Sequence, residues 1–420
     1  MPESSFKRIS VIGLGYIGLP TAAMFASRKI EVVGVDVNQH AVDTINRGEV
    51  HIVEPDLDMV VHAAVHEGYL RATNEPEPAE AFLIAVPTPF KGEDHEPDLK
   101  YIEAAAKAIA PVLAVGNLIV LESTSPVGAT EAMADWLAEA RPDLTFPQTH
   151  GEASDIRVAH CPERVLPGKV MQELISNDRV IGGMTAACSA LAVKLYQSFV
   201  KGQCIIASGP RAAEMAKLTE NSFRDVNIAF ANELSVICDR IDIDVWELIS
   251  LANRHPRVNI LQPGPGVGGH CIAVDPWFIV SSAPEQARLI RTAREVNDAK
   301  PEWVVERVLK AIKRHLMKHP EISGTDVKIA IYGLAFKPDI DDLRESPALD
   351  ISRKLASRIT GPIQIVEPNI QELPDGLGMA KLVLFEDVTS DIHVMLVDHS
   401  SFKFKPVPKG EIVDARGVWL

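Results

Sequence analysis

The chain has 420 residues, of which 46% are hydrophobic and 24% charged, with a formal net charge of −15 at pH 7. This length predicts two or three domains with ample hydrophobic core. The acidic balance argues against a surface for nucleic acid or anionic membranes, although local Arg and Lys side chains can still form a pocket for an anionic nucleotide. The five cysteines show neither a C-x-x-C pair nor zinc-site spacing, so we expect reduced thiols and no bound metal.

The N-terminal segment has the pattern of a dinucleotide-binding unit. Residues 9–18 read ISVIGLGYIG, an apolar run that ends in G-x-G-x-x-G, and residues 19–28 read as an Ala-rich helix. A second apolar run at 31–35 ends at Asp36, about 20 residues after the glycines. Strand, glycine turn, helix, second strand and terminal acid together predict a nucleotide site.

Each residue of this pattern has a physical role. Gly13 permits the tight turn, Gly15 lets the pyrophosphate approach the backbone, and Gly18 lets the helix pack closely on the strand. The phosphates then meet the N–H groups of the helix N-terminus. Asp36 is expected to accept hydrogen bonds from the ribose hydroxyls. Because a carboxylate repels a 2′-phosphate and Val37 rather than Arg follows it, the sequence favours NAD over NADP.

The same segment superficially resembles a signal peptide or a short membrane span. Lys7 and Arg8 precede an uncharged run at 9–27. Three glycines and Pro20 interrupt this run, and a strand that ends at an acid follows it. We therefore expect neither a signal peptide nor a span, and a cytoplasmic protein.

Apolar runs alternate with helical stretches up to about residue 200, which predicts a mostly parallel sheet with right-handed crossovers. The predicted strands are 9–12, 32–35, 81–85, 118–121 and 158–159. Ligands of such sheets bind at the carboxyl ends of the strands. The loops at these ends include residues 86–89, 122–126 and 161–164.

The middle of the chain predicts long helices. Residues 211–240 contain no Pro or Gly and have apolar residues at helical spacing, so a helix of about 45 Å could join two domains and serve as a dimer face. A second helical pattern covers 285–318, with Pro301 as an expected break or kink. We expect domain boundaries near 205 and 318, giving segments 1–205, 206–318 and 319–420.

The last segment reads as a second α/β domain. A helix is expected to start at Ser346 and Pro347, a cap followed by proline. The predicted strands are 328–332, 363–366, 393–397 and 412–414. Since G-x-G-x-x-G is absent here, this domain is expected to bind something other than a second dinucleotide.

Residues 264–276, GPGVGGHCIAVDP, place Cys271 at the end of a glycine-rich loop with Asp275 four residues later. Glycines let a backbone approach a ligand closely. A thiol presented there fits a nucleophile, with the carboxylate as its acid/base partner. From these residues alone, an inert buried cysteine in a structural loop stays open as the alternative.

Six ordered motifs together resemble the UDP-glucose/GDP-mannose dehydrogenase family over nearly the whole chain. They are ISVIGLGYIG at 9–18, ESTSPVG at 122–128, CPER at 161–164, AEMAKLTEN at 213–221, the loop at 264–276, and GLAFKPDIDDLRESP at 333–347. Within the family, NRHPRVN at 253–259 and PGPGVGGHC at 263–271 are similar to the branch that acts on UDP-N-acetylhexosamines.

The resemblance implies an α/β protein with three parts: an N-terminal Rossmann domain for NAD, a central helical domain with one long helix, and a C-terminal Rossmann-like UDP-binding domain. It implies a homodimer active in polysaccharide biosynthesis. The implied reaction oxidises the C6 alcohol of UDP-N-acetyl-D-mannosamine to a carboxylate with two NAD, through a thiohemiacetal and a thioester on Cys271. The same reaction on UDP-N-acetyl-D-glucosamine stays open. So do a two-electron β-hydroxyacid dehydrogenase and an NAD-sensing scaffold, although these leave Cys271 without a role.

The resemblance also assigns residues. Lys217 and Asn221, four apart on one helix face, are expected at the C6 oxygen, with a solvated surface pair as the alternative. Asp275 matches the active-site aspartate, and Glu163 and Thr124 match residues that order water. Cys161 is expected to be structural, and Glu163 could instead pair with Arg164. Expected cofactor contacts are Gly13, Gly15, Tyr16, Ile17, Gly18, Asp36, Pro87, Thr88, Ser123, Thr124 and Arg344. Expected substrate contacts are Glu163, Arg164, Val165, Lys217, Asn221, His255, Arg257 (reaching the partner subunit's site), Gly266, Gly268 and Lys337. No role is expected for His270.

Overall fold

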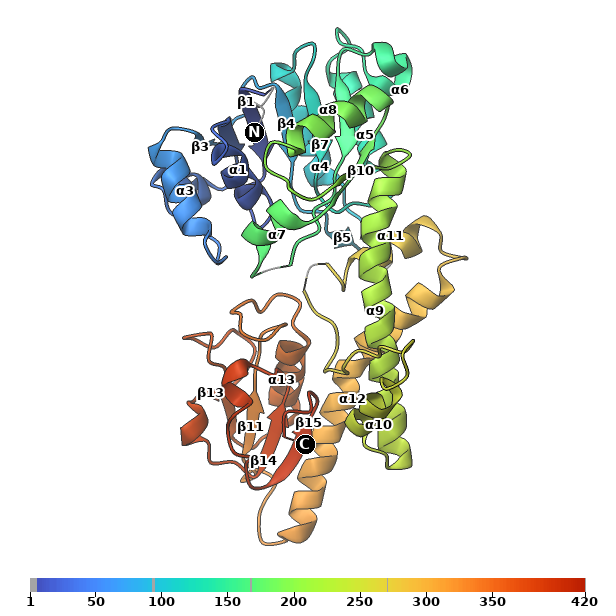
Figure 1. Ribbon diagram of the computed structural model, residues 1–420. Coiled ribbons are helices and arrows are strands. Elements are labelled where there is room, and N and C mark those ends of the chain that lie inside the picture. Colours follow the sequence, from blue (N-terminus) through green and yellow to red (C-terminus); the bar gives the residue numbers. More distant parts are fainter. Residues whose placement is uncertain (1–5, 93–94, 167, 270, 420) are drawn as a thin grey trace. The chain divides into compact units, whose positions relative to one another are not determined.

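The computed structural model describes residues 6–92, 95–166, 168–269 and 271–419. The chain forms two compact units. The first comprises Met1–Glu220 with Trp277–Pro284, and the second Asn221–Pro276 with Glu285–Leu420. Each unit has its own sheet (Figure 1).

The first unit is built on an eight-stranded sheet in the order β10-β9-β8-β7-β4-β1-β2-β3. All neighbouring strands are parallel except β8 and β9, which are antiparallel. The strands are β1 (Arg8–Ile12), β2 (Glu31–Val35), β3 (Leu70–Thr73), β4 (Ala81–Ile84), β7 (Leu118–Leu121), β8 (Arg157–His160), β9 (Arg179–Gly183) and β10 (Cys204–Ile206). A small antiparallel pair joins β5 (Phe90–Lys91) and β6 (Glu96–Pro97).

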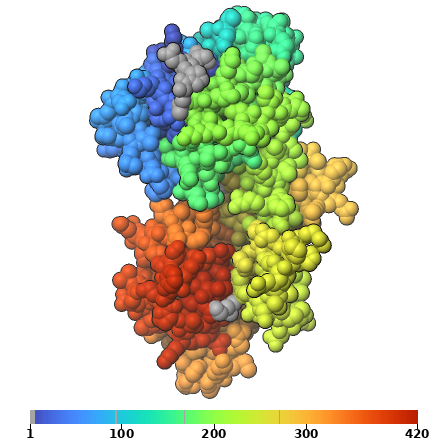
Figure 2. Space-filling model, viewed as in Figure 1, coloured from blue at the N-terminus to red at the C-terminus, as the bar shows by residue number. Residues whose placement is uncertain are grey.

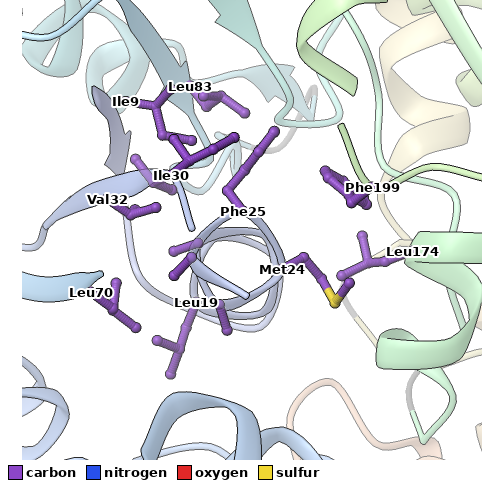
Figure 3. Close-up of a cluster of buried hydrophobic side chains, with 14 of the residues drawn as sticks. Ile9, Leu19, Met24, Phe25, Ile30, Val32, Leu70, Leu83, Leu174 and Phe199 are labelled. Carbon is purple, nitrogen blue, oxygen red and sulfur yellow. The ribbon is translucent and has the colours of Figure 1, made fainter. Parts of the chain in front are cut away.

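Helices cover both faces of this sheet. They are α1 (Gly18–Ala26), α2 (Gln39–Asn46), α3 (Leu57–His66), α4 (Lys100–Ile109), α5 (Ala129–Ala140), α6 (Pro147–His150), α7 (Val170–Ser176) and α8 (Ala186–Tyr196). Successive strand residues point to opposite faces. Leu83 and Val120 therefore pack with α1, whereas Phe82 and Ile119 pack with α4 and α5. Figure 3 shows the first cluster, with Phe25 of α1 among the strand and loop side chains.

The second unit holds a parallel five-stranded sheet in the order β13-β12-β11-β14-β15. The strands are β11 (Ile329–Tyr332), β12 (Ile363–Val366), β13 (Lys381–Leu382), β14 (Ile392–Met395) and β15 (Glu411–Asp414). Helices α12 (Arg288–Lys318) and α13 (Pro347–Arg358) pack side by side on one face (Figure 1). As predicted, the Ser346 side chain caps α13 by accepting from the Leu349 amide, and Pro347 is its first residue.

Two long helices organise the middle of the chain. Helix α9 (Pro210–Ile241) has 32 residues and confirms the helix predicted over 211–240. Helix α12 continues through Pro301, so the expected break is wrong there. Proline removes one backbone hydrogen bond, and the buried neighbours Val304 and Val305 hold the helix against the sheet. Two short helices, α10 (Val245–Ala252) and α11 (Asp275–Ser282), complete the central segment. No helix in the described ranges is long and apolar enough to cross a membrane.

Candidate active site

The glycine turn after β1 has the geometry that its sequence predicts. Gly13 has φ = +91°, a left-handed conformation that favours glycine. A Cβ on Gly18 would lie 1.7 Å from the Gly13 carbonyl oxygen, so only glycine allows helix α1 to approach the turn. A Cβ on Gly15 would meet nothing within 4 Å, so open space lies where the pyrophosphate is expected.

Asp36 follows β2 and is fixed beside this turn. Its Oδ2 accepts from the Leu14 amide at 2.8 Å, and its Oδ1 accepts from the Asn38 amide at 2.8 Å. In a Rossmann unit, the acid at this strand end meets the ribose hydroxyls. The next residue, Val37, is 95% exposed and brings no positive charge to attract a 2′-phosphate. The turn and the carboxylate therefore fit NAD.

The loops after β4 and β7 are joined by side-chain hydrogen bonds. The Ser123 hydroxyl donates to the Val86 carbonyl at 2.6 Å, and the Thr88 hydroxyl donates to the Thr124 carbonyl. The structure thus brings together the expected contacts Thr88, Ser123 and Thr124, at the same edge of the sheet as the glycine turn.

Glu163, in the loop after β8, is held by an arginine that sequence reasoning did not single out. Its Oε2 accepts from Arg179 Nη1 at 2.6 Å, and both side chains are almost fully buried, at 5% and 2% exposure. The alternative expectation, a salt bridge between the Glu163 and Arg164 side chains, is wrong. The Arg164 guanidinium pairs with Glu220 at 2.6 Å, and only the Arg164 amide reaches Glu163, at 2.7 Å.

Other ionisable groups surround this pair. The Tyr196 hydroxyl donates to Glu122 Oε1 at 2.6 Å, and burial raises the pKa of Glu122 to about 7 despite the attraction of Arg179. Burial likewise raises the pKa of Cys161 to about 12, so this thiol stays protonated, as suits a structural cysteine. The one feature of the sequence that could have indicated this buried cluster is that Arg179 and Glu122 each adjoin an apolar run.

Helix α9 carries Lys217, which is half-buried, and Asn221, which is buried. Residues four apart lie on one face of a helix. One turn before Lys217, the carboxylate of Glu214 accepts from the Gly128 and Thr130 amides at 2.7 and 2.8 Å and from the Thr130 hydroxyl at 2.6 Å. This carboxylate caps the N-terminus of α5 and so anchors the first turns of α9.

Cys271, Asp275 and Asn221 meet in the second unit. The Asp275 amide donates to the Cys271 carbonyl at 2.8 Å, which closes a turn between them. The Asp275 side chain is 2% exposed and accepts from the Asn221 amide group at 2.5 Å. Cys271 is exposed, unlike an inert core cysteine. His270 lies outside the described residues.

The glycine loop before Cys271 is fixed at several points. The Gly264 amide donates to Asn232 of α9 at 2.8 Å. Gly266 has φ = +146°. A Cβ on Gly268 would lie 2.4 Å from the Glu345 carbonyl oxygen, so glycine is required there for packing against the segment before α13.

The loop after β11 presents Lys337, which is half-buried. Glu367, at the end of β12, accepts from the Leu334 amide at 2.7 Å. His399 contacts Glu367 at 3.0 Å and accepts from the Asp339 amide at 2.9 Å. Glu367 and His399 therefore both hold the loop that follows β11. Arg344 is exposed and pairs with Asp342 at 2.6 Å.

Arg257 and His255 lie in an exposed segment after α10. The side chain of Asn253 bonds to both the amide and the carbonyl of Ile260, at 2.7 and 3.0 Å, and so closes a loop around them. The Arg257 amide lies 3.3 Å from the His255 ring. Figure 2 shows this yellow segment at the surface of the second unit. Arg257 is therefore available to another molecule.

Comparison with known proteins places these features in one family. Three family models of the UDP-glucose/GDP-mannose dehydrogenases match: the NAD-binding domain at residues 7–200, the central domain at 211–299 and the UDP-binding domain at 330–419. A UDP-N-acetyl-D-mannosamine dehydrogenase of Yersinia pestis is 66% identical over 99% of this chain and 100% of its own length. An NDP-N-acetyl-D-galactosaminuronic acid dehydrogenase of Ralstonia nicotianae is 64% identical over 99% and 97%.

A solved structure agrees with this similarity. The UDP-D-ManNAc dehydrogenase of Pyrococcus horikoshii superposes with a TM-score of 0.86 at 39% identity and covers 98% of this chain and 96% of its own. The fold of this chain is thus shared over nearly its whole length with a known enzyme of this kind. The chain belongs to the UDP-glucose/GDP-mannose dehydrogenase family and has its NAD-binding, central and UDP-binding domains in that order.

Proposed function

We propose that this NAD-dependent oxidoreductase converts the C6 alcohol of UDP-N-acetyl-D-mannosamine to a carboxylate in two oxidation steps. One observation carries the proposal. Cys271 is an exposed cysteine whose backbone carbonyl bonds to the amide of Asp275, the buried partner of Asn221, in a chain that also has a turn suited to NAD. A simple alcohol dehydrogenase needs no such thiol, whereas an enzyme that retains an aldehyde does.

The chemistry balances with two molecules of NAD, each of which accepts one hydride. Loss of the first hydride and a proton turns the alcohol into an aldehyde. The Cys271 thiolate adds to the aldehyde carbon, and the aldehyde oxygen takes up a proton, which gives a thiohemiacetal. Loss of the second hydride and a proton gives a thioester. Water then cleaves the carbon–sulfur bond, which releases the acid and returns the thiol. The thiol traps the aldehyde, so no free aldehyde leaves.

The polar residues have distinct proposed roles. Lys217 and Asn221 stabilise the developing negative charge on the C6 oxygen. Asp275, oriented by Asn221, exchanges a proton with the thiol or with water. Glu163 and Thr124 order the water that cleaves the thioester. Lys337 and Arg257 neutralise phosphate charge of the UDP sugar.

The identity of the sugar substrate is inferred from the names of the similar proteins. Six of the similar proteins, including that of Escherichia coli K12, carry the mannosamine name at 64% identity or more, while two Ralstonia proteins carry a galactosaminuronic name at 64%. The matched UDP-binding domain favours a nucleotide sugar over a β-hydroxyacid. The test is the NADH yield and the specificity constant for UDP-N-acetyl sugars of the manno, gluco and galacto series and for UDP-glucose. A higher specificity constant for another sugar would replace UDP-N-acetyl-D-mannosamine.

We also propose a homodimer in which Arg257 completes the partner's substrate site. Helix α9 supports this, because Phe223, Phe230 and Ile237, spaced by seven residues, are 69%, 51% and 46% exposed. An apolar stripe of this kind marks an association surface. We assign segment 1–205 to NAD binding, 206–318 to catalysis and dimerisation, and 319–420 to UDP binding.

A further inference from the structure

Arg179 is unusual in being a charged side chain inside the first unit. It begins β9, is 2% exposed, and places Nη1 2.6 Å from Glu163 Oε2. Its guanidinium carbon lies 5.1 Å from the ring centre of Tyr196 and 5.8 Å from that of Phe199. A buried charge is costly to retain unless it is paired. The carboxylate that Arg179 pairs with directly is that of Glu163.

Four ionisable groups around this pair come from four different parts of the fold. Glu122 follows β7, Cys161 precedes Glu163 in the loop after β8, Tyr196 ends α8, and Cys204 begins β10. Among the described residues, these are the titratable groups that interact with the pair. The Arg164 side chain is turned away to Glu220 and the Asp178 carbonyl. Arg179 is thus the cation that neutralises Glu163.

The same cluster contains an internal comparison. Glu122 and Glu163 are both buried carboxyl groups, yet only Glu163 receives an N–H of Arg179. Glu122 instead accepts from the neutral Tyr196 hydroxyl, and burial raises its pKa to about 7. Its Oε2 and the Nη2 of Arg179 have no partner among the described residues. Without a direct cation, a carboxyl group in this environment holds a proton near neutral pH.

We infer that Arg179 is a positioning residue that pairs with the Glu163 carboxylate and aims it, so that Glu163 can take the proton from the water that cleaves the Cys271 thioester. This inference deepens the proposed function and rests on its assignment of Glu163. The Arg164 amide donates to the other carboxylate oxygen, Oε1, at 2.7 Å. Glu163 is therefore held by a backbone amide at one oxygen and by the Arg179 side chain at the other. Hydride loss does not involve this carboxylate.

The inference predicts a specific kinetic defect in Arg179→Met. The two hydride losses should stay fast while thioester cleavage slows, so rapid mixing should show a burst of about two NADH per active site before a slow steady state. The steady-state rate at pH 7 should fall about 100-fold, within the range for loss of a general base. The acid limb of the pH–rate profile should move up by about one to two pH units, because a buried carboxyl group without its cation protonates more readily. KM values should change little.

A double-mutant cycle makes the test decisive. In a Glu163→Gln background, Arg179→Met should cost less than about threefold, because its effect passes through Glu163. Two controls accompany it. Arg294→Met breaks an equally buried pair with Asp225, also at 2% exposure, and should lower stability without moving the acid limb. Arg179→Lys keeps the charge but loses the planar fork, and should give a smaller loss with the same burst. It replaces Arg179→Met if that variant does not fold.

The outcomes separate the two claims. Losses that multiply in the double mutant, or an Arg179 variant that is slow without an NADH burst, overturn the positioning role and leave the proposed function intact. Near-normal acid formation by Glu163→Gln removes Glu163 from the proposed function and the positioning role with it. Coupled losses with a burst support the inference.

Discussion

Replacement of Glu122 by Gln should stabilise the protein relative to wild type, and this difference in stability should grow as the pH rises. In the folded protein, burial raises the pKa of Glu122 from 4.5 to about 7. The folded state therefore binds this proton more tightly than the unfolded state does. The resulting stabilisation is complete below about pH 4.5 and is lost as the pH rises toward and through about 7.

The size of the effect follows from these two values. One pKa unit corresponds to about 1.4 kcal/mol, so ionising Glu122 in the folded state costs about 3 kcal/mol, most of it incurred between pH 5 and pH 8. Glutamine keeps the oxygen that accepts from Tyr196 and removes the titration. For a unit of this size, about 1 kcal/mol shifts the melting temperature by about 2–4 °C.

Melting curves at pH 5, 6.5 and 8 provide the assay. The melting temperature of Glu122→Gln minus that of wild type should increase by about 5–10 °C from pH 5 to pH 8. This difference cancels the titration of other groups. Glu139→Gln, at an exposed position on α5, is the control and should give a difference independent of pH. A constant difference for Glu122→Gln as well would refute the buried, protonated state of Glu122.

Three further predictions concern the cofactor and the proposed dimer. Asp36→Ala should weaken NAD binding by about 1.5–3 kcal/mol, the contribution of a hydrogen bond to a charged group, and narrow the preference over NADP; equal wild-type rates with both cofactors at low concentration would count against the role of Asp36. Gly18→Ala should abolish NAD binding, because its Cβ would lie 1.7 Å from the Gly13 oxygen, and retained affinity in a titration would contradict that geometry. Arg257→Ala and Cys271→Ala should each be nearly inactive, yet mixed dimers should regain activity, since one of their two sites holds both native residues. No recovery despite proven subunit exchange would argue against a shared site.

Local patterns predicted most of the fold. The strand predicted at 118–121 is β7 itself, and the cap at Ser346 starts α13 where expected. The antiparallel step at β8–β9 was not predicted, because pairing direction depends on long-range contacts that an apolar run does not encode. A break at Pro301 was wrong for a similar reason, since α12 continues through it and packs against the sheet.

Some residues of the candidate site could likewise be predicted from the sequence, and others could not. Residues in glycine-rich or strand-end motifs, such as Asp36 and Cys271, could be named from the sequence because local geometry presents them. Arg179 could not, since its importance arises only when β9 places it against Glu163, 16 residues earlier in the chain. A charged residue at the start of an apolar run most often lies at the surface, and only the folded structure shows this one to be buried.

The stoichiometry of the reaction tests the central claim most directly. Wild type with UDP-N-acetyl-D-mannosamine should form two NADH per sugar consumed, with the uronic acid as product and no free aldehyde. Cys271→Ala should still bind NAD, because the turn at Gly13 and Asp36 is unchanged, but should form almost no uronic acid. Formation of uronic acid by Cys271→Ala at near the wild-type rate would contradict covalent capture of the aldehyde by Cys271.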